Sequence, residues 1–368
     1  NAWNELIPVA ALTCCNPQLR AFETQLRQRI FWHDEIKCDR STYPFLEIPW
    51  QINYGNYGVT VSKHRVSDAP GASMTWDAYP LQDLERDLPK LRFREPTVDR
   101  AVTAQTVELA DDLFGDLLPP RLHRETYWWT HGLTIQAVDL VGLENLMLLM
   151  YDQPDGVHRL MAFLRDDQLN LMRWFEREGL LHDNCRNDNI GSGGAGHTDE
   201  LPRADRAPGA PVQLCDLWGF SESQETVGVS PAMFAEFIFP YQNELSALFG
   251  LNYYGCCEGL HERWEIIRQV PRLRCVSVSP WADQARMAAQ LGRAYVYCRK
   301  PLPTLVCGPT FDEEGIRADL RATLAVAGHL NLQIILKDTH TVHHEPGRIG
   351  RWVQLAREEL FRYQVGAS

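Results

Sequence analysis

LNYYGCCEGLHERWEIIRQVPRLRCVSV, residues 251–278, is the stretch that decides the fold. Residues 251–254 and 273–278 are short apolar runs of the kind that forms buried strands. Between them, three apolar residues share one face of a helix: Leu260, Trp264 and Ile267. Because parallel neighbours need a long connection, which a helix supplies, the stretch predicts a strand–helix–strand unit of a parallel sheet.

The same alternation continues to the end of the chain and occurs again in its first half. Further strands are expected at 45–52, 127–130, 295–297 and 332–336, and the clearest helices at 18–31, 154–177, 231–242 and 282–291. Four successive strand-then-helix units fit either a closed barrel or an open doubly wound sheet, and the strands of the first half favour the barrel. We therefore predict an α/β TIM (β/α)8 barrel. Residues 1–368 would form one domain, with residues 1–44 as an N-terminal helical extension.

Charge and composition exclude several classes of partner. The 36 basic and 48 acidic side chains give a net charge of −12, which repels nucleic-acid phosphates and anionic lipid. The longest apolar runs, such as 146–150, are far shorter than the roughly 20 residues that a membrane-spanning helix needs. Ten cysteines are too few for a disulfide framework, and no export signal opens the sequence. We expect a protein of the reducing cytoplasm.

Glycine is concentrated in residues 191–196, within the longest stretch that lacks helical or strand periodicity. A phosphate-binding loop would continue with Gly-Lys-Ser or Gly-Lys-Thr, and no such motif follows. The composition therefore predicts a flexible loop.

Polar side chains follow each of the last four expected strands. In a parallel α/β barrel these positions emerge on one face, where barrel enzymes keep their active sites. The four segments are Gly255-Cys256-Cys257-Glu258, Ser279-Pro280-Trp281, Cys298-Arg299-Lys300-Pro301 and Lys337-Asp338-Thr339-His340. Thiols, carboxylates, an imidazole and fixed cations would thus share one mouth of the barrel.

Thiols together with an imidazole predict zinc, whose catalytic sites use three protein ligands and keep one position open. Cys257 and His340 are the leading ligands, with Glu258 or Cys256 as the third. The alternative is that Cys256 and Cys257 are small buried hydrophobes. A substrate thiol bound to zinc would lose its proton at neutral pH and become a nucleophile that can accept a methyl group.

Aromatic and polar residues near the same strand ends predict a small-molecule pocket. The candidates for substrate binding are Asn187, Trp218, Gln224, Trp281 and Arg299, and the candidates for proton transfer are Glu222 and Asp338, with Glu258 as a further one. A hydrated surface loop is the competing interpretation of the segments around Asn187 and Trp218. Trp128, Trp129 and His131 end another expected strand, and we expect His131 to be a buried structural histidine.

From about Phe45 to the C-terminus the sequence resembles the uroporphyrinogen decarboxylase superfamily. The resemblance lies in the order of the helix at 231–242, Gly255-Cys-Cys-Glu, Ser277-Val-Ser-Pro-Trp and Lys300-Pro-Leu-Pro. Within the superfamily, the sequence resembles the corrinoid and coenzyme M methyltransferases more than the true decarboxylases. These methyltransferases hold zinc with a His-x-Cys motif and a later cysteine. Cys257 matches the motif cysteine, whereas Gly255 stands at the histidine position and the later cysteine falls near Thr339 or His340. The arginine-rich signature of true uroporphyrinogen decarboxylases is not found.

The resemblance implies a zinc-assisted methyltransferase that moves a methyl group between a small methylated donor and a corrinoid, thiol or folate acceptor. The corrinoid (cobalamin) would be bound to a separate carrier protein, and a homodimer is a further expected assembly. Two alternatives stay open. One is a metal-free, decarboxylase-like lyase that binds an anionic substrate through Arg186, Arg299 and Lys300, and the other is a non-catalytic barrel that binds a ligand.

Overall fold

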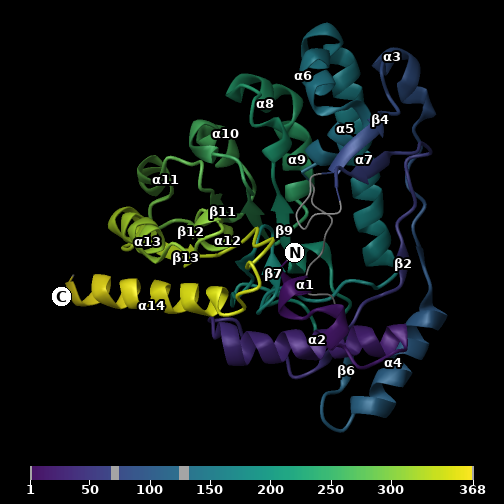
Figure 1. Ribbon diagram of the computed structural model, residues 1–368. Helices are drawn as coiled ribbons and strands as arrows, with labels where there is room; N and C mark the ends of the chain where they lie inside the picture. The colour runs from purple at the N-terminus through teal and green to yellow at the C-terminus, as the bar shows by residue number, and fades with distance from the viewer. Residues whose placement is uncertain (1, 68–73, 124–131, 367–368) are drawn as a thin grey trace. The chain divides into compact units, whose positions relative to one another are not determined.

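The computed structural model describes residues 2–67, 74–123 and 132–366, and the chain divides into two compact units (Figure 1). The central unit consists of Pro44–His64 and Met74–Asp283. The terminal unit consists of Asn1–Tyr43, Arg65–Ser73 and Gln284–Ser368. Two compact units can belong to one domain, so the single-domain organisation of residues 1–368 stays a prediction.

The central unit contains two groups of parallel strands. β9 (Trp218–Ser221), β10 (Leu251–Tyr254) and β11 (Leu273–Val278) pair in parallel with β10 in the middle. β1 (Leu46–Ile48) pairs in parallel with β6 (Pro120–Leu122). All four side chains of β10 are buried, as is typical of a parallel strand that is covered on both faces. The strands expected at 251–254 and 273–278 therefore form within the expected bounds.

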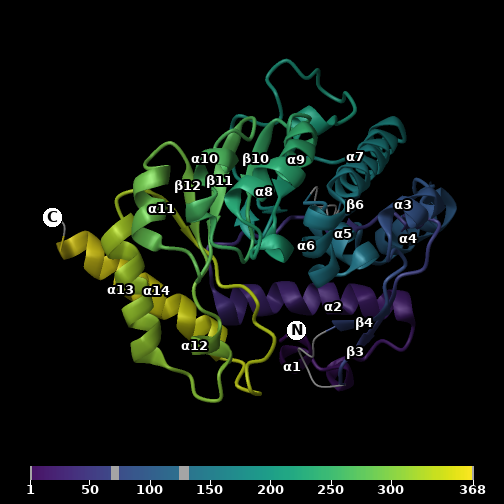
Figure 2. The ribbon, with the colours of Figure 1, turned by 90° about the horizontal axis from the view of Figure 1, so that it is seen from above.

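Helices connect and cover these strands. They are α3 (Leu84–Asp87), α4 (Arg100–Phe114), α5 (Thr134–Val141), α6 (Leu143–Asp152), α7 (Pro154–Arg177), α8 (Pro231–Phe237), α9 (Phe239–Ser246) and α10 (Trp264–Ile267). Short strands complete the unit: β2 (Ile52–Asn53), β3 (Ser62–Arg65), β4 (Met74–Ala78), β5 (Thr97–Val98), β7 (Asn189–Ile190) and β8 (Gly194–Ala195). α9 lies against β9 (Figures 1 and 2), so the crossover from β9 to β10 returns over the sheet.

α7 forms over the whole range that its periodicity predicts. Proline suits its first turn, where the missing N–H has no partner to lose. Its apolar stripe is buried: Val157, Leu160, Met161, Leu164, Leu171, Met172 and Phe175. Asp167 is buried in the same helix and accepts hydrogen bonds from the backbone nitrogen of Arg94 at 2.7 Å and from its Nε at 2.6 Å. This ion pair ties the helix to the segment that precedes α4.

The single helix expected at 231–242 is broken in two. α8 ends at Phe237 and α9 begins at Phe239, with Ile238 outside helical geometry at φ −122°. Pro240 is the physical reason, because it has no N–H to donate to the carbonyl four residues earlier and its ring crowds that turn. The break allows α9 to follow a different direction, which places Gln242 in the buried centre of the unit.

The terminal unit carries the remaining elements. They are α1 (Trp3–Leu6), α2 (Pro17–Phe31), α11 (Gln284–Leu291), β12 (Val296–Arg299), α12 (Thr304–Cys307), α13 (Glu313–Ala327), β13 (Asn331–Ile334) and α14 (Arg348–Gly366). β12 and β13 pair in parallel. A buried core joins α13 and α14 through Ile316, Leu320, Trp352 and Val353. At its edge the Glu359 carboxylate bonds Arg317 at 2.7 Å and Arg321 at 2.8 Å, which holds these two helices together.

The glycine-rich stretch forms a hairpin, so the expectation of a flexible loop is replaced by a specific turn. β7 and β8 pair antiparallel, with Ile190 opposite Gly194. Gly191 lies at φ +62°, and a Cβ atom there would meet Cδ1 of Tyr253 at 2.5 Å and Cδ2 of Phe220 at 2.7 Å. The stretch is rich in glycine because its backbone lies directly on two aromatic rings. A periodicity search cannot detect this kind of contact.

The α/β class with parallel strands and helical connections is confirmed, and the closed eight-stranded barrel stays a prediction. The strand expected at 127–130, with Trp128, Trp129 and His131, lies outside the described residues. Within the parts of the chain that are described, no helix combines the length and apolar character needed to cross a membrane.

Replacing Gly191 with alanine tests the contact between the hairpin and the sheet. Gly191→Ala places a methyl group against Tyr253 and Phe220 in a left-handed backbone, and overpacking of this kind destabilises by about 1–3 kcal/mol. Gly179→Ala is the matched control, because Gly179 has φ +65° with no atom within 4 Å of an added Cβ and would lose only about 1–2 kcal/mol of backbone energy. Urea unfolding should therefore show the larger loss for Gly191→Ala. Equal losses would contradict the packed hairpin.

Candidate functional site

Two polar segments leave the sheet at the same edge of the central unit. β9 and β10 are parallel with Ser221 opposite Tyr254, so Glu222 and Gly255 both start just beyond the strand ends. The backbone nitrogen of Gly255 donates to the carbonyl oxygen of Ser221 at 2.8 Å and extends this register by one step. Residues 222–226 and 255–258 are thereby held next to each other, because neighbouring parallel strands present their carboxyl ends at one edge. The sequence predicts the strand before 255–258 but not β9.

Glu258 fastens the two segments together. Its side chain is 3% exposed, and one carboxylate oxygen accepts the backbone nitrogen of Ser223 at 2.8 Å. The other oxygen accepts the backbone nitrogen of Cys256 at 2.9 Å. The guanidinium of Arg263 donates to the Ser223 hydroxyl at 3.1 Å and to the carbonyl oxygens of Thr226 and Val229. A buried carboxylate that accepts several N–H groups is stabilised in its ionised form.

Glu222 is also buried beside this carboxylate, and it accepts fewer N–H groups. It is 4% exposed and accepts the backbone nitrogen of Gln224 at 2.9 Å. Burial raises the pKa of Glu222 well above its usual range, and the nearby charges of Glu225, Glu258 and Cys256 act in the same direction. Burial also raises the pKa of Glu258, where the N–H groups of Ser223 and Cys256 oppose the rise. Burial therefore favours the protonated form of Glu222, whereas the N–H groups that Glu258 accepts favour its ionised form.

Gln242 holds the backbone at this position. Its Nε2 donates to the carbonyl oxygen of Glu222 at 2.8 Å and to that of Gly132 at 2.6 Å. Its Oε1 accepts the Tyr254 hydroxyl at 2.7 Å. A Cβ atom on Gly132 would lie 2.7 Å from Oε1 of Glu222, so the chain passes close to the carboxyl group. These contacts fix Glu222 from two sides.

Two thiols lie on the same loop. The sulfurs of Cys256 and Cys257 are 3.6 Å apart, and the Ser192 hydroxyl donates to the Cys256 sulfur at 3.3 Å. Tetrahedral zinc, with Zn–S bonds of about 2.3 Å, places two sulfurs roughly 3.8 Å apart, so the pair fits two ligand positions. Glu258 directs both oxygens at N–H groups, and across the described ranges no third Cys, His, Asp or Glu ligand atom completes a site around these sulfurs. The sulfur pair alone does not constitute a zinc site.

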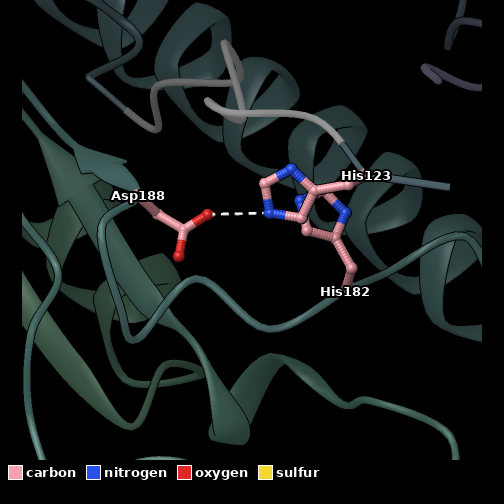
Figure 3. Close-up of side chains that lie close together, drawn as sticks. All are labelled: His123, His182 and Asp188. Carbon is pink, nitrogen blue, oxygen red and sulfur yellow. Dashed lines mark hydrogen bonds and ion pairs between the residues drawn. The ribbon is translucent and has the colours of Figure 1, made fainter. Parts of the chain in front are cut away.

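A second cluster lies in the same unit and consists of His123, His182 and Asp188 (Figure 3). One potential ligand atom from each residue lies within 4.8 Å of the other two. His123 follows β6, and His182 and Asp188 belong to the segment between α7 and β7. Figure 3 shows the Asp188 carboxylate pointing toward the rings of the two histidines, whose centroids are 4.2 Å apart.

His123 lies between two carboxylates. Its Nδ1 is 2.7 Å from Oε1 of Glu47, and its Nε2 is 2.9 Å from Oδ1 of Asp188. Burial opposes the charged imidazolium, but the hydrogen bonds to Asp188 and Glu47 outweigh it and raise the pKa of His123 to about 9. The backbone places Glu47 and His123 together, because β1 and β6 pair in parallel and the His123 nitrogen donates to the Ile48 carbonyl at 3.1 Å.

The hairpin connects the two clusters. Asp188 directly precedes β7, and Ser192 at the turn reaches the Cys256 sulfur. Ser192 is four positions after Asp188, so their Cα atoms are at most about 14 Å apart. Both clusters therefore belong to one region of the central unit.

The other residues singled out from the sequence have the following places. In the central unit, Asn187 is buried next to Asp188, Gln224 donates to Glu222, and Trp281 is 70% exposed. Trp218 starts β9, is buried, and donates from its indole to the Gly196 carbonyl at 3.0 Å. In the terminal unit, Arg299 is buried and bonds Asp319 at 2.7 Å, whereas Asp338 and His340 are exposed after β13. Cys257 and His340 belong to different units, and their shared zinc stays a prediction.

The structure brings together Glu222, Gln224, Cys256, Cys257 and Glu258 from the predicted set. It also shows residues that the sequence analysis did not connect: Glu47, His123 and His182. They are isolated in the sequence and form no spaced motif, so only the pairing of β1 with β6 and the path of the chain after α7 bring them together. Asp188 is the neighbour of Asn187, a predicted substrate-binding residue, and the sequence gives no sign that it meets the histidines.

Comparison with solved structures gives a likeness over nearly the whole chain. The chain resembles a methyltransferase from Methanosarcina mazei with a TM-score of 0.52 and 11% sequence identity, covering 97% of this chain and 91% of that chain. No family model matches the sequence, and a search of curated proteins found no match. At this identity the likeness shows a shared fold. The chain thus has an α/β fold that a methyltransferase also adopts, and membership of the uroporphyrinogen decarboxylase superfamily stays a prediction.

Proposed function

We propose that the protein is a methyltransferase whose reaction takes place at the strand ends of β9 and β10. It would move a methyl group from a small methylated donor to a corrinoid, thiol or folate acceptor, and the corrinoid would be bound to a separate carrier protein. The observation that carries the proposal is buried Glu222, whose pKa is raised by burial, next to the loop that holds the Cys256 and Cys257 thiols. The fold shared with a methyltransferase over 97% of the chain supports it.

A protonated carboxyl is the group that methyl transfer from oxygen needs. When the carbon–oxygen bond of a methoxylated donor breaks, its electron pair stays on oxygen, and an alkoxide is a poor leaving group unless it takes up a proton. Glu222 would supply that proton as the methyl carbon bonds to the electron pair of the acceptor. If the acceptor is a thiol, its own proton returns to Glu222. If the acceptor is cob(I)alamin, which carries no proton, Glu222 takes up a proton from solvent, so that atoms and charges balance over the cycle in both cases.

The neighbouring groups keep this proton in place. Glu258 is held by two N–H groups and carries the negative charge of the pair, which disfavours a second charge on Glu222. Burial strengthens the effect, because two carboxylates in a site of low polarity cannot both ionise without a large free-energy cost. Glu222 is therefore prepared to act as a general acid at neutral pH, whereas Glu258 orders the loop that carries the thiols.

Glu222→Gln tests the role of the proton in the reaction. Glutamine keeps the size and the hydrogen bond to Gln224 but has no acidic proton, so kcat for a methoxylated donor should fall about 100-fold or more. Methanol and methoxybenzoates serve as donors with free cob(I)alamin as acceptor, and methylcobalamin formation is followed by absorbance. Glu236→Gln is the matched control, because Glu236 is 59% exposed and lies outside the site. Unchanged turnover in Glu222→Gln, or no consumption of donor by the wild type, would contradict the proposal.

The raised pKa of Glu222 predicts a pH-dependent stability. An unfolded glutamate titrates near about 4.3, whereas folded Glu222 keeps its proton to higher pH, so the wild type loses stability as the pH rises through this window. Glu222→Gln has no such group. Its free energy of unfolding should improve relative to the wild type between about pH 5 and about pH 8. Urea unfolding at several pH values measures this difference, with Glu236→Gln expected to follow the wild type. Parallel curves for wild type and Glu222→Gln would show that Glu222 is ionised.

A further inference from the structure

We propose that His123, His182 and Asp188 bind one divalent transition-metal ion, with Glu47 as the residue that orients His123. The ligands would be Nε2 of His123, one ring nitrogen of His182 and a carboxylate oxygen of Asp188. The inference is independent of methyl transfer, because it concerns a metal-binding site with its own ligands and its own measurements.

The distances within the cluster fit one ion after a small adjustment. Zinc with bonds of about 2.0–2.1 Å to nitrogen and oxygen places its tetrahedral ligand atoms roughly 3.4 Å apart. Here His123 Nε2 and Asp188 Oδ1 are 2.9 Å apart, and all three ligand atoms lie within 4.8 Å of one another. Side-chain shifts of about 1 Å are sufficient for three bonds.

Burial favours a bound ion over a chance surface cluster. His123 and Asp188 are buried and His182 is partly buried. The backbone N–H of Arg186 donates to Oδ2 of Asp188 at 3.3 Å, which helps to fix the orientation of this carboxylate. The Phe45 ring contacts the His123 ring edge-on at a centroid distance of 5.2 Å, which limits rotation of the imidazole. Two of the three ligands are therefore positioned before an ion arrives.

Glu47 supplies the feature that distinguishes a metal ligand from an ordinary buried histidine. Metal-binding histidines usually donate their second N–H to a carboxylate, which fixes the tautomer and raises the basicity of the ligand nitrogen. The Glu47 carboxylate lies 2.7 Å from His123 Nδ1 and accepts its proton, so Nε2 is the nitrogen directed at Asp188 and His182. Without an ion Nε2 carries the proton that it shares with Asp188, and a bound metal ion would release this proton to solvent. Glu47 is placed by β1, between the buried residues Leu46 and Ile48, so its position follows from the sheet.

The ligand types select the class of ion. Two imidazoles and one carboxylate suit zinc, iron(II) or cobalt(II), whereas magnesium and calcium prefer sites made only of oxygen atoms. Three protein ligands leave at least one position open for water or a substrate atom, as in catalytic zinc sites. The sulfurs of Cys256 and Cys257 are not part of this set. The structure thus separates a sulfur-free metal site from the thiol loop.

Zinc binding to the full chain tests the site. After dialysis against a chelator and then against buffer, isothermal titration with zinc should show one ion bound by the wild type. His182→Gln and Asp188→Asn should abolish this binding, and Glu47→Gln should weaken it about 10- to 100-fold. His64→Gln is the matched control, because His64 and Asp77 form an exposed pair at 2.7 Å that belongs to no three-ligand cluster, and zinc binding should not change. Zinc binding that persists in His182→Gln and Asp188→Asn, or no binding by the wild type, overturns the proposal.

Cobalt(II) gives a second test that needs no variant of the cluster. Cobalt bound by imidazole and carboxylate shows visible ligand-field bands without the near-ultraviolet charge-transfer band that thiolate ligands produce. The wild type and a Cys256→Ser, Cys257→Ser double variant should give the same spectrum. A thiolate band that disappears in the double variant would place the ion on the sulfurs and overturn the inference. Neither outcome depends on turnover of a methyl donor, so failure of the proposed function would be seen separately.

Discussion

The parallel register of β9 and β10 is the constraint on which the rest of the candidate site depends. Ser221 opposite Tyr254 makes both chains leave the sheet at the same level, so Glu222 and the loop of Cys256, Cys257 and Glu258 come together without any sequence motif that joins them. A shift of one residue would turn every side chain of a strand to the other face. All four β10 side chains are buried, so such a shift would force the packing on both faces of the strand to change and is strongly disfavoured.

The buried polar groups at this edge depend on one another. Glu258 can carry a charge away from water because N–H groups of two separate segments point at it, and those segments are ordered because Glu258 bonds both. Gln242 has the same double role through Tyr254 and Glu222. A buried polar network of this kind favours one arrangement strongly. Each buried donor or acceptor that loses its partner costs about 1–3 kcal/mol of stability, and a charged group costs more. Glu222 accepts one backbone N–H group whereas Glu258 accepts two, and burial raises the pKa of Glu222.

The hairpin formed by β7 and β8 extends the site beyond the strands that the sequence indicates. Its glycine lies on Tyr253 and Phe220, its Ser192 reaches the Cys256 sulfur, and Asp188 stands at its base beside His123. The hairpin and the residue before it therefore contact both the loop of the two thiols and the histidine cluster. The pair of carboxyl groups, Glu222 and Glu258, adjoins the same loop. Its glycines let the backbone lie close to the rings of Tyr253 and Phe220. Its polar residues Asp188 and Ser192 contact His123 and Cys256.

The sequence by itself determined the α/β class and the bounds of β10, β11 and α7, and it placed Cys256, Cys257 and Glu258 just beyond the end of β10. These features follow from local periodicity and from the rule that parallel strands present their carboxyl ends together. Only the tertiary structure decided that Glu222 is buried with a raised pKa, that the glycine stretch is a packed hairpin, and that Glu47, His123, His182 and Asp188 meet. Each of these depends on burial or on contacts between residues far apart in the chain, and periodicity carries no information about either.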